Sequence, residues 1–176
     1  MNKNILLILS LCVIATMAKH KHSSNEDMPQ VMNARDDANN FLRGFVKAYM
    51  ETSIGGDFTQ CHGSNSVLMT EIKYYLRMFN NHNHQTLGYN IYAALNRVMR
   101  FPYCEAIDAR VYNQMQDSLR RPGYDYEFVL HYTGVHLNTD GARMVSLCNQ
   151  IADTTNRDDF YRAGQLFGQL CDLMFG

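Results

Sequence analysis

Histidine is the side chain best suited to proton transfer near neutral pH, and this chain has seven of them. His131, His136 and Asp140 form the most enzyme-like set, because a histidine beside a carboxylate can act as a general base. Spacings of five and four residues do not align all three on one helical face. The chain also has no H-E-x-x-H and no G-x-S-x-G motif. We therefore assign no catalytic residue and keep a hydrolase using His131 or His136 as an alternative.

Metal binding is the second chemistry that histidines suggest. His82 and His84 flank Asn83, and two imidazoles one residue apart can share a metal ion. A catalytic zinc site needs a third protein ligand, and no residue supplies one by its spacing. We therefore expect a polar loop here, and neither a metal nor a cofactor.

The first eighteen residues read as a cleavable secretory signal. Lys3 gives a short positive start, and an apolar run from Ile5 to Ala15 follows it. Thr16-Met17-Ala18 places small residues at the −3 and −1 positions of a signal peptidase site. The run is shorter than the roughly 20 apolar residues that cross a bilayer. We expect export with cleavage after Ala18, to the cell exterior or the lumen of the secretory pathway; an uncleaved signal anchor is the alternative.

The charge balance excludes two classes of partner. The chain has 16 Lys and Arg against 17 Asp and Glu, and loss of Lys3 with the signal leaves a net charge of −2. A nucleic-acid binder would show a basic stripe, and adhesion to an anionic membrane would need clustered cations. We therefore expect no nucleic acid and no electrostatic adhesion to a membrane, and the short apolar run at the start gives the separate expectation of no stable membrane span. The partner is expected to be a protein or an apolar small molecule.

Four cysteines remain after signal cleavage: Cys61, Cys104, Cys148 and Cys171. An even number in an exported chain predicts two disulfides. Cys61 and Cys104 flank two helices of nearly equal length, so a bridge between them closes the base of an antiparallel hairpin. A bridge between Cys148 and Cys171 requires a steep helix crossing, because a simple hairpin offsets the two by about 10 Å along the axis. Two buried free thiols, or a crossed pairing, are the alternatives.

The periodicity of apolar residues predicts the elements that carry these groups. Apolar positions recur every three or four residues, with few prolines and repeated capping residues. We expect an all-α fold of about six helices in a compact bundle or orthogonal array, stapled by disulfides. A mobile polar segment at 19–28 precedes a single helical domain at 29–176. The expected helices lie near 29–54, 64–79, 86–100, 102–119, 125–137, 138–153 and 158–174.

Several local expectations follow from the same periodicity. Thr86 is expected to cap the third helix, Tyr89 to lie on its buried stripe, and Asp158 to cap the last helix. Residues 120–124 contain Pro-Gly and are expected to form a turn. Residues 125–137 could be strand or helix, and the helical surroundings favour helix. Gly164 and Gly168 form G-x-x-x-G in an amphipathic helix, and we expect Gly44 to be where a second backbone approaches them.

The last helix also carries a resemblance. The segment Asp159-Phe160-Tyr161-Arg162-Ala163-Gly164-Gln165-Leu166-Phe167-Gly168, the style of the signal and the richness in asparagine resemble small exported helical proteins of ciliated protozoa. Those families have no assigned activity. The resemblance implies an exported all-helical protein and identifies no functional residue.

These observations favour a non-enzymatic protein that acts by binding or as structural cargo. The export signal, the expected disulfides and the lack of a catalytic set all support that expectation. Eleven methionines and eleven tyrosines give a soft interior, so a helical carrier of an apolar ligand such as a lipid is a further alternative.

Overall fold

The computed structural model describes residues 27–51, 64–101 and 109–176, and every regular element in these ranges is a helix. The expected signal, Cys61 and Cys104 lie outside these residues. Two compact units divide the chain, residues 1–33 and residues 34–176. The described part of the first unit is the beginning of one helix. The second unit contains the core and all the sites considered below.

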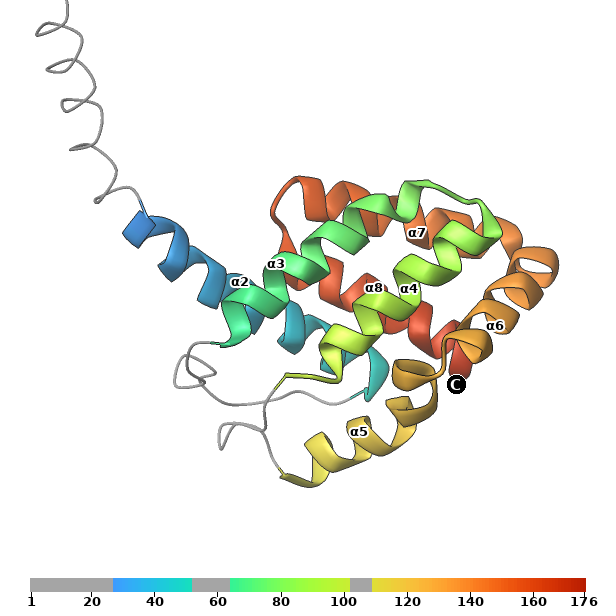
Figure 1. Cartoon of the computed structure of the whole chain (residues 1–176), viewed down its shortest axis with the longest axis horizontal. Helices are drawn as coiled ribbons and strands as arrows, with labels where there is room; N and C mark the ends of the chain where they lie inside the picture. Colours follow the sequence, from blue (N-terminus) through green and yellow to red (C-terminus); the bar gives the residue numbers. More distant parts are fainter. Residues whose placement is uncertain (1–26, 52–63, 102–108) are drawn as a thin grey trace, which may run out of the picture. The chain divides into compact units, whose positions relative to one another are not determined.

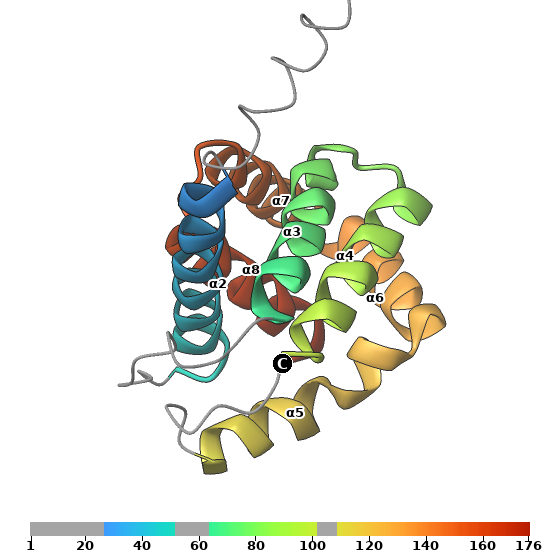
Figure 2. The same ribbon diagram turned by 60° about the vertical axis from the view of Figure 1, so that its left-hand side comes forward.

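Seven α-helices form the described part of the chain: α2 (Asp27–Tyr49), α3 (Ser64–Arg77), α4 (His84–Val98), α5 (Ala109–Tyr124), α6 (Tyr126–Thr139), α7 (Gly141–Asn156) and α8 (Phe160–Phe175). A 3₁₀ turn, η2 (Met78–Asn80), follows α3. In the second unit α3 and α4 form an antiparallel hairpin, α7 and α8 form another, and α6 packs on α4 (Figures 1 and 2). The expected all-α class is confirmed, and each of the seven α-helices described overlaps one of the expected ranges.

Phenylalanine rings from three elements form the centre of the core. Phe167 of α8 lies 6.2 Å from Phe41 and 5.6 Å from Phe45, measured between ring centroids, and both partners lie on α2. Phe79 of η2 meets the same ring at 5.8 Å. All four side chains are fully buried. Burial of each contributes about 1.5–3 kcal/mol, so this cluster is a principal source of stability.

Glycines let α2 and α8 approach at backbone distance, as the sequence predicted. A Cβ atom on Gly164 would overlap the carbonyl oxygen of Phe41, and one on Gly44 would overlap that of Tyr161. A Cβ atom on Gly168 would lie 2.7 Å from the carbonyl oxygen of Phe45. Without side chains at these positions the two helices pack closely enough for the phenylalanine rings to interlock.

Helix α5 extends further than its sequence suggested. Pro122 and Gly123 were expected to form a turn, but both are helical and buried. The Asn96 side-chain amide of α4 donates a 2.9 Å hydrogen bond to the Gly123 carbonyl, which has no partner within its own helix. Gly123 also leaves room for Met99, whose Cγ would lie 2.5 Å from a Cβ there. Contacts with α4 therefore override the local Pro-Gly signal.

Two helix starts differ from expectation by the choice of capping residue. Asn83, rather than Thr86, caps α4, and its side chain accepts a hydrogen bond from the Thr86 backbone N–H at 3.2 Å. Asp159, rather than Asp158, caps α8 by accepting from the Arg162 N–H at 3.1 Å. Asp158 instead takes a positive φ of 58° in the turn after α7. Aspartate tolerates this conformation, so the turn needs no glycine.

The first helix ends five residues before its predicted end at 54, whereas the ends of α6, α7 and α8 fall within three residues of the predicted ones. Helix α2 begins at Asp27, before the expected start at Pro29, and ends at Tyr49. Glu51 follows with a φ of 50°, a left-handed conformation that stops the helix. Residues 126–139 are the helix α6, which confirms helix over strand for this segment. Its cap is Asp125, whose carboxylate accepts from the Phe128 N–H at 3.0 Å.

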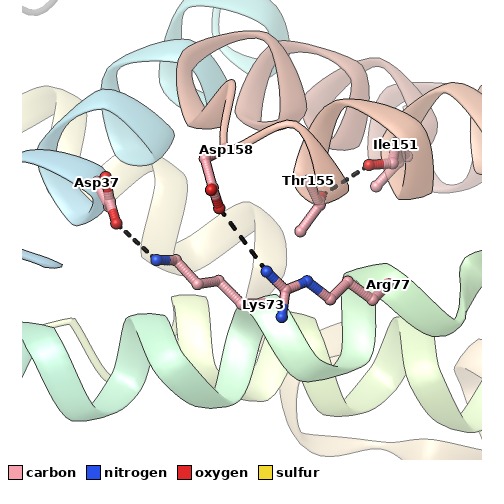
Figure 3. A network of polar contacts seen from close by, with 6 residues as sticks. All are labelled: Asp37, Lys73, Arg77, Ile151, Thr155 and Asp158. Atoms are coloured by element: carbon pink, nitrogen blue, oxygen red, sulfur yellow. Dashed lines mark hydrogen bonds and ion pairs between the residues drawn. The ribbon is translucent and has the colours of Figure 1, made fainter.

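Polar contacts fix α3 against its neighbours (Figure 3). Lys73 donates to the Asp37 carboxylate of α2 at 2.5 Å, and each side chain is 20% exposed. Arg77, one turn later, reaches Asp158 at 3.7 Å across an exposed surface. Because the first pair is partly buried and the second is in water, the first carries more of the stabilisation.

Candidate functional site

The two described cysteines are buried and chemically quiet. Cys148 of α7 and Cys171 of α8 are free thiols. The structure therefore has the alternative of two buried thiols and not the Cys148–Cys171 bridge. Burial raises the pKa of the Cys148 thiol to about 12. Burial also raises the pKa of the Cys171 thiol, and the nearby negative charge of Asp172 raises it further. A thiol that keeps its proton is a poor nucleophile and metal ligand. The Cys61–Cys104 bridge stays a prediction.

The His82 and His84 side chains contact different helices. The His84 Nε2–H donates to the backbone oxygen of Leu130 on α6 at 2.8 Å. The His82 Nε2 lies 3.0 Å from the Asn149 Oδ1 on α7. His82 therefore secures the loop before α4 to α7, and His84 secures the first residue of α4 to α6, which are structural roles. In the described part of the chain, no group of three or more His, Cys, Asp or Glu is placed to hold a metal ion.

The structure brings His136 and Asp140 together and leaves His131 apart. His136 Nδ1 is buried without a hydrogen bond, and it lies 3.8 Å from Asp140 Oδ2. That distance is too long for a hydrogen bond. His131 is exposed, and five residues along a helix turn the side chain by about 140° relative to His136. The two histidines therefore do not meet in one cleft with a carboxylate.

The described surface has two adjoining depressions on α5 and α6, both open to solvent, which we call the α5–α6 groove. The larger has a volume of about 750 Å³ and the smaller about 420 Å³, and they share Arg121 and Asp125. The larger is also lined by Met99, Gln116, Asp117, Arg120 and Tyr124. The smaller is also lined by Glu127, Phe128, His131 and Tyr132. Helices α5 and α6 thus supply nearly all of the lining.

Arg121 and Asp125 organise the centre of the groove. The Arg121 guanidinium lies over the Phe128 ring, 4.2 Å from its centroid, and its Nε lies 3.8 Å from Asp125 Oδ2. Asp125 is held in place because it caps α6. A guanidinium stacked on a ring keeps edge N–H groups available for a ligand. The same side chains offer donors, acceptors and an aromatic face.

The lining of this groove mixes charges of both signs with aromatic rings. It combines cations (Arg120, Arg121) with anions (Asp117, Asp125, Glu127) and the rings of Tyr124, Phe128 and Tyr132. Among the described lining residues there is no serine, threonine or cysteine to serve as a nucleophile for acyl transfer. Such a surface can hold a partner with mixed charges and apolar groups.

Sequence reasoning missed this groove, although it singled out His131. Residues 120–124 were expected to be a turn, and residues 125–137 were left between strand and helix. The surface forms only because both segments are helical and meet at Asp125. The signal that points to it is Arg120-Arg121-Pro122-Gly123-Tyr124-Asp125, where charged and aromatic residues surround a helix break.

Two further observations bear on the classes of function considered. Within the described ranges, no helix combines the length and the apolar character needed to cross a bilayer. No family model, no characterised protein and no solved structure matches this chain.

Proposed function

We propose that this protein is exported into the secretory pathway and acts there as a non-enzymatic binding protein through the α5–α6 groove. The observation that carries the proposal is the groove lining, in which charges of both signs alternate with aromatic rings across two adjoining depressions. The cysteines and the histidine pair near α4 support it, because each is occupied in packing or in hydrogen bonds to the fold.

An extended peptide segment is the ligand that suits this surface. Sites for apolar small molecules are concave and mostly hydrophobic, and they enclose most of the ligand. This groove is open, carries five charged side chains and continues across Asp125 into the second depression. A peptide can place acidic groups near Arg120 and Arg121, basic groups near Glu127 and an apolar side chain on Phe128. The expected contacts are individually weak and cumulative.

The export half of the proposal rests on residues 1–18 and has its own test. The full chain should be expressed in a eukaryotic cell that secretes protein, and the N-terminus of the product in the medium should be sequenced. We expect secreted protein that begins at Lys19, because the small residues at positions 16 and 18 direct cleavage there. Protein retained in membranes with its first residues intact would identify a signal anchor instead.

The binding half is tested with a displayed library of random peptides. The purified protein should enrich a consensus of mixed charge, and the double variant Arg121→Ala/Phe128→Ala should bind the enriched peptides at least tenfold more weakly. Tyr161→Ala is the matched control, because Tyr161 is an exposed aromatic residue of α8 that does not line the groove. Failure to enrich any sequence, or equal binding by the double variant, would refute the groove as the binding surface.

The non-enzymatic part is tested with a panel of ester, peptide and glycoside substrates. We expect no turnover above that of the denatured protein. Reproducible hydrolysis that disappears in His131→Ala or His136→Ala would overturn this part and restore the hydrolase alternative.

A further inference from the structure

Side chains on one face of α6 form a continuous column that runs from the groove to the end of the helix. Its members are Phe128, Tyr132, His136 and Asp140, and their spacing of four residues places them on the same face. The Phe128 and Tyr132 rings are 4.6 Å apart between centroids, and the His136 ring stacks on Tyr132 at 6.3 Å. Phe128 and Tyr132 line the smaller depression, whereas Asp140 lies at the junction with α7. We call these four residues the α6 column.

The column contains a buried nitrogen without a partner. In the described part of the chain, His136 Nδ1 is the only buried side-chain nitrogen or oxygen that makes no hydrogen bond. Such atoms are rare in folded proteins, because a buried polar atom without a partner lowers stability. The group that this nitrogen faces is Asp140 Oδ2, at a distance of 3.8 Å. That gap is wider than a hydrogen bond.

Asp140 also lacks a strong partner, although it occupies the N-cap position of α7. Its side chain makes no capping hydrogen bond with that helix. The hydrogen bond that its Oδ2 accepts from the Thr139 hydroxyl is long, at 3.5 Å. Because its side chain is 51% exposed, the carboxylate can turn toward His136 without leaving a closely packed position. A movement of about 1 Å would bring the two side chains into hydrogen-bond distance.

A proton on His136 changes what this pair can do. A neutral imidazole gains little from a carboxylate at this distance, whereas an imidazolium would form an ion pair with a hydrogen bond of about 2.7–2.9 Å. The last turn of α6 and the face of the Tyr132 ring both favour a cation at this position. Burial opposes the charge, since the His136 side chain is 16% exposed, and the ion pair must outweigh that cost.

Within the described chain, Asp140 is the only carboxylate in ion-pairing distance of His136. Helices α4, α5, α7 and α8 all pack against α6. His84 and two tyrosines of α4, and Arg121 of α5, contact earlier residues of α6. Phe175 of α8 meets the column and is uncharged, and the charge that faces His136 from the side of α7 is Asp140 itself. The response of this histidine to pH therefore depends on one carboxylate.

We propose that His136 and Asp140 form an acid-operated lock at the end of α6. When His136 takes up a proton, the two side chains close into an ion pair and hold the rings of the α6 column in their stacked arrangement. Histidine is the side chain that changes charge between about pH 5 and pH 8. The lock would be open at neutral pH and closed in the acidic compartments of a secretory pathway, a setting that rests on the proposed export.

The lock would also regulate the α5–α6 groove, a consequence that rests on the proposed binding function. Tyr132 lies between His136 and Phe128 in the column and forms part of the groove wall. A side chain that is already ordered loses less conformational freedom when a ligand binds. Peptides selected on the groove should therefore bind about two- to tenfold more tightly when the lock is closed.

Thermal unfolding of the full chain, after signal removal, tests the lock at about pH 5.5 and about pH 7.5. The closed pair exists only in the folded chain, so acid should stabilise the fold. The wild-type Tm should gain about 2–5 °C from acid beyond the gain of His136→Gln or Asp140→Asn. Asparagine is as good an N-cap as aspartate, so the second variant keeps the start of α7. His131→Gln replaces an exposed histidine of the same helix and should keep the wild-type gain.

Three results would overturn the lock. An equal gain in the wild type and in His136→Gln would show that this histidine does not take part. A full gain in Asp140→Asn would show that the carboxylate is not its partner. Loss of the gain in His131→Gln would place the responsible proton elsewhere on α6.

Peptide binding tests the regulation of the groove separately. At about pH 5.5 the selected peptides should bind the wild type about two- to tenfold more tightly than Asp140→Asn, and at about pH 7.5 the two proteins should bind equally. Equal binding at both pH values would overturn the effect on the groove. The unfolding measurement uses no peptide, so a failed lock would leave the groove proposal as it stands, and a failed peptide selection would leave the lock to be decided by Tm.

Discussion

The close approach of α2 and α8 makes Gly164→Ala the most informative substitution in the core. A Cβ at this position would overlap the backbone oxygen of Phe41, and backbone cannot turn aside as a flexible side chain can. The two helices must separate by on the order of 1 Å, and a gap of that size removes a quarter to a half of the dispersion energy at each contact. The affected contacts include the rings that meet on Phe167.

The expected magnitude follows from two opposing terms. Loosening of this packing costs about 3 kcal/mol, within the range for overpacked cores, and alanine returns up to about 1 kcal/mol through its higher helix propensity. The free energy of unfolding should therefore fall by about 2 kcal/mol and Tm by roughly 4–8 °C. Urea denaturation followed by far-UV circular dichroism measures the first quantity, with an unchanged m-value as evidence that only stability has changed.

Gly141→Ala is the matched control for this prediction. Gly141 is also the glycine of a helix, at the start of α7, but no atom lies within 4 Å of the position its Cβ would occupy. This variant should unfold at the same urea concentration as the wild type, or slightly above. If Gly164→Ala were as stable as Gly141→Ala, the backbone contact between α2 and α8 would not exist as described, and the reasoning would be wrong.

Three further predictions concern charge and thiols. Lys73→Ala should lower the free energy of unfolding by about 1–2 kcal/mol in urea titrations, because it removes a partly buried ion pair and the cation over an aromatic ring of α8. Arg77→Ala should lower it by less than about 0.5 kcal/mol, because its ion pair is exposed. Equal losses in the two variants would contradict the difference in burial. Cys148 and Cys171 should resist a thiol reagent in the native protein at neutral pH, and both should react after unfolding without reductant. If the two cysteines stayed unreactive in the unfolded chain, they would be joined by a disulfide. Burial raises the pKa of Cys148 from 9.0 to about 12. The free energy of unfolding should therefore fall as the pH rises from about 9 toward 12, because only the unfolded chain loses this proton. Cys148→Ala should weaken that fall, and an identical pH dependence in the variant would refute the assignment.

Helical periodicity was predictable because it is a local property. The apolar residues near Phe41 and Phe167 recur at the spacing of one helix face, and both are fully buried. The glycines of α8 were also recognisable, because a small residue at every fourth position has one main structural use. In each case the information lies within a few residues of the chain, where sequence reasoning is strongest.

The departures all involve partners far away in the chain. Asn96 satisfies the Gly123 carbonyl and keeps α5 helical through Pro122, a contact between residues 27 positions apart. Tyr89 was expected to be buried, but contacts with Tyr75 and Tyr126 hold it at the surface between three helices. Neither the Pro-Gly pair nor the helical spacing contains this information.

The sequence by itself determined the all-helical class, the approximate positions of the helices and the expectation of export. Those properties follow from periodicity, capping chemistry and the apolar run at the start, which act over one or two helical turns. Only the tertiary structure decided that His82 and His84 contact separate helices, that Cys148 and Cys171 are buried thiols, and that α5 and α6 form a groove at Asp125. The physical reason is that a site is made by side chains from different helices, and their meeting depends on how the helices pack.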